Sequence, residues 1–223
     1  MTFPVNQQSP VPCSSIEEVN ARWGHLKYMS LEKATWLRHL IIENDLADLL
    51  ELGFFQGKSS AFMAAVLEER GKGHLTTLDL RSAVNRNPPY SEVLQSLGLS
   101  NRVTPILAHR SFTWELCKML ERKPRPRFDF CYFDGGHLWD PTGFAFLLVD
   151  MLLRPGAVVV FDDLDWTIED SVKNGRKPPL GYGDEEMAAK QVRKVWEILV
   201  PERGYTDLQE MKGFQWGVAK KPI

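Results

Sequence analysis

The strongest constraint on the fold is an alternation of short apolar segments with longer helical ones that begins near residue 46. Five segments carry the composition of buried strands, and helix-like segments separate them: 47–53, 74–80, 103–108, 128–134 and 157–163. Apolar strands separated by helices of this length form parallel sheets that are covered on both faces. The sequence therefore predicts a doubly wound α/β sheet.

The end of the chain follows a different pattern. A helix is expected over 185–199, and two further strands over 204–211 and 214–221 are joined by a short turn. Strands connected so closely pair antiparallel. We therefore expect seven strands, mostly parallel, with an antiparallel hairpin at the C-terminus.

Helical signals precede the sheet. The first dozen residues are expected to form a flexible arm, and Ser15 with Glu18 has the spacing of a capping box. A second helix is expected over 31–44, with apolar residues at helical spacing: Leu31, Ala34, Leu37 and Ile41. We predict an arm with cap helices over 1–45 and the main domain over 46–223.

Composition restricts the classes of function. A formal net charge of -2 gives no general attraction to nucleic acid or anionic lipid. The N-terminus lacks the pattern of a signal peptide, and the longest apolar run, near 144–153, is broken by Asp150 and too short to span a bilayer. Three scattered cysteines exclude a disulfide framework. We expect a cytoplasmic protein with no membrane or nucleic-acid partner, and a homo-oligomer is compatible with the sequence.

A glycine-containing turn follows the first predicted strand, in the segment ELGFFQGKSS. Gly53 and Gly57 flank the turn and allow a ligand to approach the backbone. Ser59 lies at the start of the next helix, where free N–H groups favour an anion such as a carboxylate. The spacing differs from those of dinucleotide sites and P-loops. A structural turn without a ligand is the alternative.

The second predicted strand ends at Asp79. An acidic residue at this position of an open α/β sheet commonly binds ribose hydroxyls. The alternative is an aspartate that caps the following turn. Together, the glycine turn and Asp79 favour a nucleoside ligand that carries a carboxylate.

The segment LLELGFFQGKSS followed by LTTLDL resembles the S-adenosylmethionine (SAM) site of class I methyltransferases, and E-L-G-x-x-x-G-x-S is similar to the catechol O-methyltransferase type. The resemblance extends from about Asp48 to Lys220. It implies that Gly53 and Ser59 face the methionine part of SAM and that Asp79 binds its ribose. The expected cofactor-binding residues are Glu51, Gly53, Gly57, Ser59, Asp79, Ser111 and Asp134.

Two segments differ from related patterns. The family usually has a Gly-Asp-Ser-like turn near the adenine after the third strand, whereas this chain has His109-Arg110-Ser111 and lacks the acidic contact. The tetrapeptide Asn87-Pro88-Pro89-Tyr90 spells a motif of amino-group methyltransferases, which have it after the fourth strand. Here it follows the second strand, so we interpret it as a proline-stiffened loop.

Three carboxylates follow two predicted strands. Asp134 ends the fourth strand, and Asp162 and Asp163 end the fifth. Neighbouring strands lie about 5 Å apart, so the three charges would repel one another unless a cation offsets them. Oxygen ligands suit Mg²⁺, Mn²⁺ or Ca²⁺, and we expect Mg²⁺. In the alternative, Asp163 faces solvent, Asp162 caps a turn and Asp134 bonds to the glycine turn.

His137 stands three residues after Asp134, in the segment FDGGH. Metal-dependent O-methyltransferases have metal ligands at the positions of Asp134, Asp162 and Asp163, and the resemblance implies a general base at His137. Catechol-type members have lysine there, and FDGGH is similar to macrolide sugar O-methyltransferases that use histidine. A structural hydrogen bond or a fourth metal ligand is the alternative for His137.

A long polar loop over about 165–185 follows the carboxylate pair, and such loops are usually functional. We interpret it as a substrate lid, with Trp166 and Tyr182 as candidates for an aromatic wall.

The resulting prediction is a SAM-dependent, metal-assisted O-methyltransferase acting on a small hydroxylated molecule such as a sugar, a catechol or a polyketide. The alternatives are a metal-independent methyltransferase, a nicotinamide-dependent oxidoreductase and a SAM-binding protein without turnover. The glycine spacing and the terminal hairpin disfavour the oxidoreductase.

Overall fold

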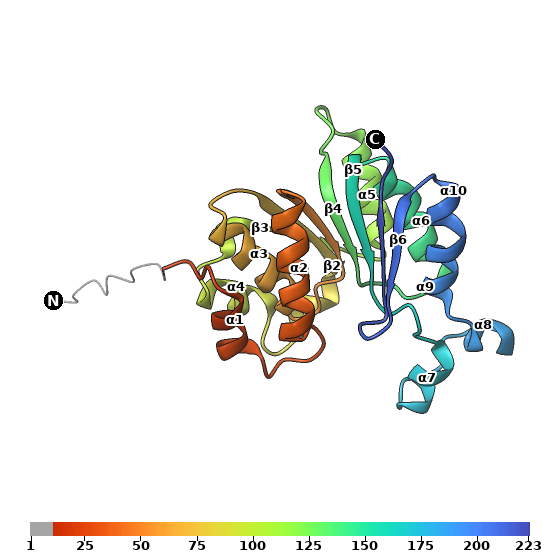
Figure 1. Ribbon diagram of the computed structural model, residues 1–223. Helices are drawn as coiled ribbons and strands as arrows, with labels where there is room; N and C mark the ends of the chain where they lie inside the picture. Colours follow the sequence, from red (N-terminus) through yellow and green to blue (C-terminus); the bar gives the residue numbers. More distant parts are fainter. Residues whose placement is uncertain (1–10) are drawn as a thin grey trace.

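Seven strands form one sheet in the order β3-β2-β1-β4-β5-β7-β6 in the computed structural model, which describes residues 11–223 (Figure 1). The first five strands are parallel, and β7 is antiparallel to both β5 and β6. The predicted doubly wound sheet with a terminal hairpin is confirmed. The strands are β1 (Asp48–Leu52), β2 (His74–Leu80), β3 (Val103–Ala108), β4 (Phe128–Phe133), β5 (Leu153–Phe161), β6 (Thr206–Met211) and β7 (Trp216–Lys220).

The order of the strands reverses between β1 and β4. The chain builds outward from β1 to β3 and then returns to place β4 on the other side of β1. In open α/β sheets, ligands bind at such a switch point, outside the carboxyl ends of the strands. Every sequence-predicted site residue except those of the lid lies at or near this edge.

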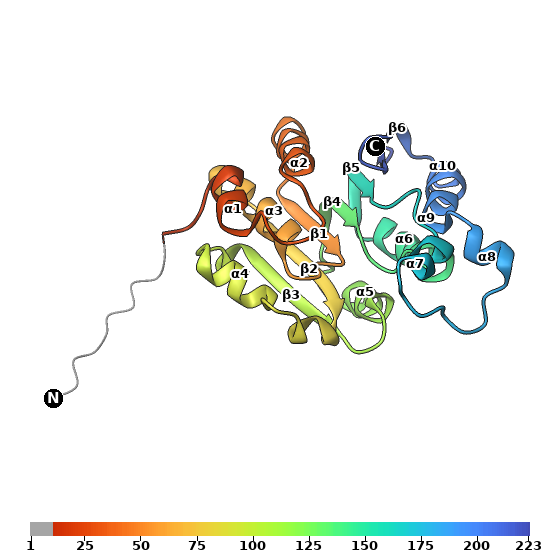
Figure 2. The ribbon, with the colours of Figure 1, turned by 90° about the horizontal axis from the view of Figure 1, so that it is seen from below.

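Helices cover both faces of the sheet (Figure 2). One face carries α1 (Ile16–Trp23), α2 (Leu31–Glu43), α3 (Lys58–Glu69) and α4 (Tyr90–Ser96). The other carries α5 (Phe112–Glu121), α6 (Trp139–Asp150) and the C-terminal helical segments. Side chains alternate along each strand, so Leu49 is buried in the first core and Leu50 in the second.

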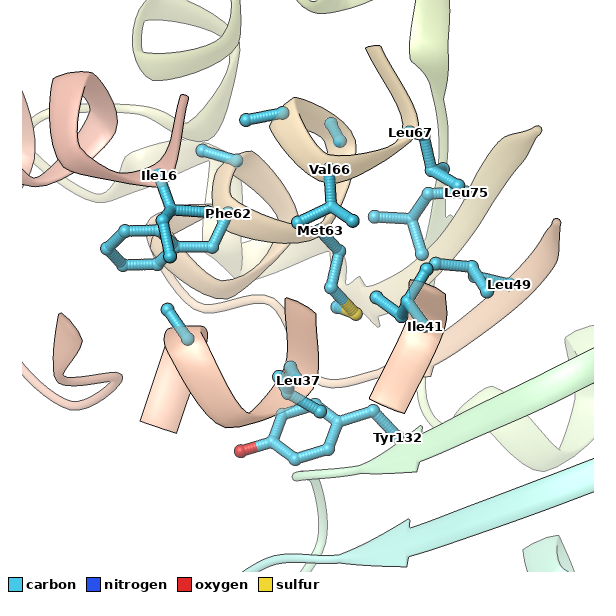
Figure 3. Close-up of a cluster of buried hydrophobic side chains, with 14 of the residues drawn as sticks. Ile16, Leu37, Ile41, Leu49, Phe62, Met63, Val66, Leu67, Leu75 and Tyr132 are labelled. Atoms are coloured by element: carbon cyan, nitrogen blue, oxygen red, sulfur yellow. The ribbon is translucent and has the colours of Figure 1, made fainter. Parts of the chain in front are cut away.

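The N-terminal helices begin where the sequence predicts. The Ser15 side chain accepts hydrogen bonds from the N–H groups of Glu17 and Glu18 at the start of α1, and Ser30 caps α2. Leu37 and Ile41 of α2 lie in the first core with residues of α3 and the sheet (Figure 3). Most of the predicted flexible arm, residues 1–10, lies outside the described residues, and the division at residue 45 stays a prediction.

The predicted continuous helix over 185–199 is wrong. The chain forms α8 (Asp184–Ala188), an extended link, α9 (Gln191–Lys194), a π turn labelled η3 (Val195–Leu199) and α10 (Val200–Glu202). Side-chain contacts of Lys190 and Gln191 explain the break. The Gln191 side chain accepts from Trp139 N–H at 2.7 Å and donates to the Glu186 carbonyl at 2.9 Å. Lys190 Nζ pairs with Asp165 Oδ1 at 2.7 Å.

The helix expected from residue 144 begins earlier, at Trp139, because Pro141 fits the first turn of α6. Strand β5 also begins earlier than expected, at Leu153. Within residues 11–223, no helix is long and apolar enough to cross a membrane.

Candidate active site

The glycine turn after β1 brings two strand ends into direct contact. Gly53 has φ +97, and a Cβ atom there would lie 2.2 Å from the Asp134 carbonyl oxygen. Gly57 has φ +86 and starts α3. Only glycine combines a positive φ with this close approach. The backbone of the turn is therefore held against the end of β4, where the carboxylates begin.

Because of this contact, we expect Gly53→Ala to lower the unfolding free energy by more than the positive φ angle alone would. Gly71 also has a positive φ, of +64, but has open space where a Cβ would be. We expect Gly71→Ala to cost about 1 kcal/mol of unfolding free energy and Gly53→Ala about 3 kcal/mol or more. Urea denaturation of both variants measures the difference, and equal losses would show that the contact with Asp134 is unimportant.

Glu51 is fully buried at the end of β1. Its carboxylate accepts hydrogen bonds from the hydroxyl groups of Ser59, Ser60 and Thr77. Burial raises the pKa of Glu51 to about 7, although the hydrogen bonds from the three hydroxyl groups act to lower it. Because the Ser59 hydroxyl donates to Glu51, only its lone pairs and the helix backbone remain for a ligand. The two predicted cofactor residues thus contact each other.

Stability should depend on pH through Glu51. A carboxyl group whose pKa is near 4.5 in the unfolded chain and about 7 in the folded one stabilises the fold below pH 4.5. That stabilisation is lost as the pH rises through 7. Relative to Glu51→Gln, the wild type should lose about 3 kcal/mol between about pH 5 and pH 8. Urea denaturation of both proteins at both pH values tests this. A wild type whose unfolding free energy rises relative to that of Glu51→Gln between about pH 5 and pH 8 would contradict it.

Asp79 and Ser111 are both engaged at strand ends. Asp79 Oδ2 accepts from the N–H groups of Phe54 and Phe55, at 3.1 and 2.8 Å, so it fastens the glycine turn to β2. Ser111 caps α5 by accepting from Thr113 N–H at 3.2 Å. Both residues lie at the ligand-binding edge, and their roles toward a cofactor stay predictions.

The segment between α1 and α2 closes over the glycine turn. A cavity of about 20 Å³ is lined by this segment, the turn and Asp134, including Tyr28, Met29 and Ser59. A larger cavity of about 640 Å³ shares Phe55 with it and opens outward. Lys58 Nζ donates to the carbonyls of Gly24 and Leu26, at 2.9 and 2.7 Å, and holds the segment in place. Sequence reasoning missed Tyr28, Met29 and Lys58, whereas Ser59 and Asp134 were predicted.

Asp134, His137 and Asp163 meet at the ends of β4 and β5. Each offers one ligand atom, and these atoms all lie within 4.8 Å of one another. His137 Nδ1 is 3.3 Å from Asp163 Oδ2. His137 and Asp163 have positive φ angles of 43 and 60, which are uncommon for residues other than glycine. Strained backbone of this kind is concentrated at functional sites.

The electrostatics of this cluster favour a cation. Burial and the charges of Asp162 and Asp163 hold the pKa of Asp134 well above its usual range. Burial and Asp162 also raise the pKa of Asp163, although His137 lowers it. Burial lowers the pKa of His137, so its imidazole is neutral near pH 7, while the two aspartates act in the opposite direction. A bound divalent cation would relieve the repulsion between the carboxylates.

Asp162 lies apart from this group of three in its contacts. Lys33 Nζ of α2 is 3.0 and 3.1 Å from the two carboxylate oxygens, and the Tyr132 hydroxyl donates to Oδ2. The sequence predicts Asp162 as a metal ligand beside Asp134 and Asp163. The structure brings it to the same edge but pairs it with a lysine that sequence reasoning did not consider.

A comparison with protein families identifies the chain. A family model described as a methyltransferase domain matches residues 50–164, slightly more than half of the 223 residues. The chain belongs to this methyltransferase family. The class I, SAM-dependent methyltransferase inferred from the sequence is therefore confirmed, and the match covers both the glycine turn and the carboxylates.

Solved structures share the fold of this methyltransferase over almost its whole length. A Staphylococcus aureus structure assigned as a caffeoyl-CoA O-methyltransferase is 19% identical, with a TM-score of 0.66, and the match covers 93% of this chain and 92% of that one. TomG, an O-methyltransferase from Streptomyces achromogenes solved with SAM, is 20% identical over 93% and 88%, with a TM-score of 0.64. MycE, solved with Mg, S-adenosylhomocysteine and mycinamycin VI, is 16% identical over 93% and 54%, with a TM-score of 0.59. No curated protein matches the chain.

The predicted lid of the methyltransferase is partly helical. Residues Ile168–Lys173 form α7 after the carboxylate pair. The Trp166 ring lies 5.3 Å from the His137 ring, beside the cluster. Tyr182 instead lines a cavity of about 270 Å³ with Trp139 and Gln191. Trp166 thus lies beside the carboxylate cluster, whereas the roles of both aromatic residues and the motion of the lid stay predictions.

Proposed function

We propose that this methyltransferase transfers a methyl group from SAM to a hydroxyl oxygen of a small molecule, with a divalent cation assisting. The observation that carries the proposal is the meeting of Asp134, His137 and Asp163 beside the glycine turn. MycE, which has a similar fold and was solved with Mg and mycinamycin VI, supports a cation beside a small-molecule acceptor; a sugar, a polyketide or a catechol fits this chemistry.

The glycine turn fits SAM as the methyl donor. Bound SAM supplies a methyl group on a positively charged sulfur. The start of α3 provides free N–H groups for the carboxylate of SAM. The small cavity beneath the α1–α2 segment is lined by Ser59 of the turn and by Asp134, so the proposed donor site lies next to the carboxylate cluster.

The carboxylates fit a hard cation such as Mg²⁺. Asp134 and Asp163 offer oxygen atoms at one edge of the sheet, and the proposal assigns both as ligands. A cation bound there would lower the pKa of the acceptor hydroxyl and hold its oxygen. Asp162 is the third metal ligand predicted from the sequence, but its carboxylate forms an ion pair with Lys33.

His137 is the proposed general base. With Asp163 near Nδ1, its Nε2 atom is left to accept a proton, and the lowered pKa keeps the ring neutral near pH 7. As the acceptor oxygen bonds to the methyl carbon, the carbon–sulfur bond breaks with its electrons passing to sulfur. The hydroxyl proton goes to His137, so the charges balance.

A metal-independent methyltransferase is the second candidate. The pairing of Lys33 with Asp162 already neutralises one carboxylate, and the contact between His137 and Asp163 orients a base without a metal. The two candidates share the donor site and differ in their response to a chelator.

Calorimetry with S-adenosylhomocysteine tests the donor site. We expect the wild type to bind one molecule per chain. The control variant Gly71→Ala, which is remote from the turn, should bind with the same affinity. Gly53→Ala should bind at least about tenfold more weakly because the turn is displaced. The absence of binding of both SAM and S-adenosylhomocysteine by the folded wild type would refute the proposed function.

A further inference from the structure

The Asp162 carboxylate has all of its hydrogen-bonding positions filled. Oδ1 accepts from Lys33 Nζ at 3.0 Å and from Asp163 N–H at 2.7 Å. Oδ2 accepts from Lys33 Nζ at 3.1 Å and from the Tyr132 hydroxyl. A carboxylate has about four lone-pair sites, so a metal ion could bind Asp162 only by displacing one of these donors.

Lys33 is held firmly in this position. It reaches the sheet from α2, although 129 residues separate it from Asp162 in the sequence. Its side chain is 21% exposed and that of Asp162 is 8% exposed. Its Nζ atom also lies 4.9 Å from the centre of the Trp216 ring, at a distance suited to a cation–π contact. Breaking a pair buried to this degree is strongly unfavourable because it leaves a buried charge alone.

The three aspartates at this edge of the sheet can be assigned to two different positive charges. Asp134, Asp162 and Asp163 carry three negative charges when ionised, and Lys33 offsets the one that it contacts. The two that remain match a divalent cation. Those two residues, together with His137, are the ones whose ligand atoms lie within 4.8 Å of one another.

We infer that Lys33 is a positioning residue that takes the place of a metal ion at Asp162 and restricts the cation to Asp134 and Asp163 beside His137. The inference rests on the proposed metal-assisted function. It also gives α2 a role, since the same ion pair fixes this helix across the catalytic edge. A lysine that only tied the helix to the sheet would leave metal affinity unchanged when removed.

Titration of Mn²⁺ alone into the cofactor-free protein tests the inference, by calorimetry and by loss of the free Mn²⁺ signal in electron paramagnetic resonance. Lys33→Met should bind Mn²⁺ at least about tenfold more tightly, because a carboxylate is freed. Lys33→Arg retains the charge and should bind as the wild type does. Asp163→Gly accommodates the positive φ, removes a proposed ligand and should bind at least about tenfold more weakly.

The double variant Lys33→Met/Asp162→Leu is decisive because it keeps the net charge and removes the buried pair as a unit. Replacement of a buried ion pair by apolar residues is often tolerated, and circular dichroism shows whether this variant is folded. Affinity within about threefold of wild type supports the inference, since Asp162 then is not a ligand. A loss as large as that of Asp163→Gly overturns it.

The remaining outcomes also decide between the proposals. Unchanged or weaker Mn²⁺ binding by folded Lys33→Met overturns the inference. Binding by Lys33→Met but not by the wild type also overturns it, because Asp134 and Asp163 then hold no cation while Lys33 is present, and it removes the cation from the proposed function. Absence of Mn²⁺ binding by both proteins overturns it, while S-adenosylhomocysteine binding would still support methyl transfer.

Discussion

His137→Ala is expected to lower kcat by about 10² to 10⁴ while S-adenosylhomocysteine affinity stays within about threefold of wild type. The imidazole stands at the end of β4 beside Asp163 and is kept neutral by burial. Its removal deletes the group that accepts the hydroxyl proton but no residue of the glycine turn. Steady-state kinetics and calorimetry on one preparation measure both quantities.

Controls separate a base from a structural residue and from a metal ligand. His137→Asn retains a residue that tolerates φ 43, so a similar loss of kcat there excludes backbone strain as the cause. Added imidazole should partly restore turnover to His137→Ala. A tenfold or larger drop in Mn²⁺ affinity would instead indicate a ligand, and an unchanged kcat would reduce His137 to a structural role.

Removal of divalent cations is expected to lower turnover at least about 100-fold, with recovery on addition of Mg²⁺. The carboxylates explain this expectation. Burial and the charges of Asp162 and Asp163 raise the pKa of Asp134, and a bound cation would offset this repulsion. Its removal would withdraw the group proposed to lower the pKa of the acceptor hydroxyl and to hold its oxygen.

The chelated protein itself serves as the control. It should still bind S-adenosylhomocysteine, because the glycine turn and Glu51 do not depend on the cation. Full turnover in excess chelator would favour the metal-independent candidate, in which the Lys33–Asp162 pair and the His137–Asp163 contact suffice. Loss of both turnover and cofactor binding would indicate general disruption of the site.

Local signals in the sequence were sufficient for most of the fold. Strands β2 and β3 have the predicted bounds because each is a short apolar run between polar turns. The helix over 185–199 was mispredicted because tertiary contacts override the helical propensity of this segment. The hydrogen bond from Trp139 N–H to the Gln191 side chain joins residues 52 positions apart, which helical periodicity cannot relate.

The site was predictable wherever its residues end strands. Parallel strands finish at one edge, so Asp134, His137 and Asp163 had to lie near one another. The partner of Asp162 was not predicted, although a signal existed. Lys33 precedes Leu37 by four residues and Ile41 by eight, which places a lysine in line with the buried stripe of α2.

The most direct test is a crystal structure of the protein with S-adenosylhomocysteine and Mn²⁺, in which anomalous scattering locates the metal. The proposed site predicts a single peak bound by the carboxylates of Asp134 and Asp163, beside the cofactor sulfur, with Lys33 still on Asp162. Cofactor bound at the glycine turn with no peak at these carboxylates, at saturating Mn²⁺, would contradict it.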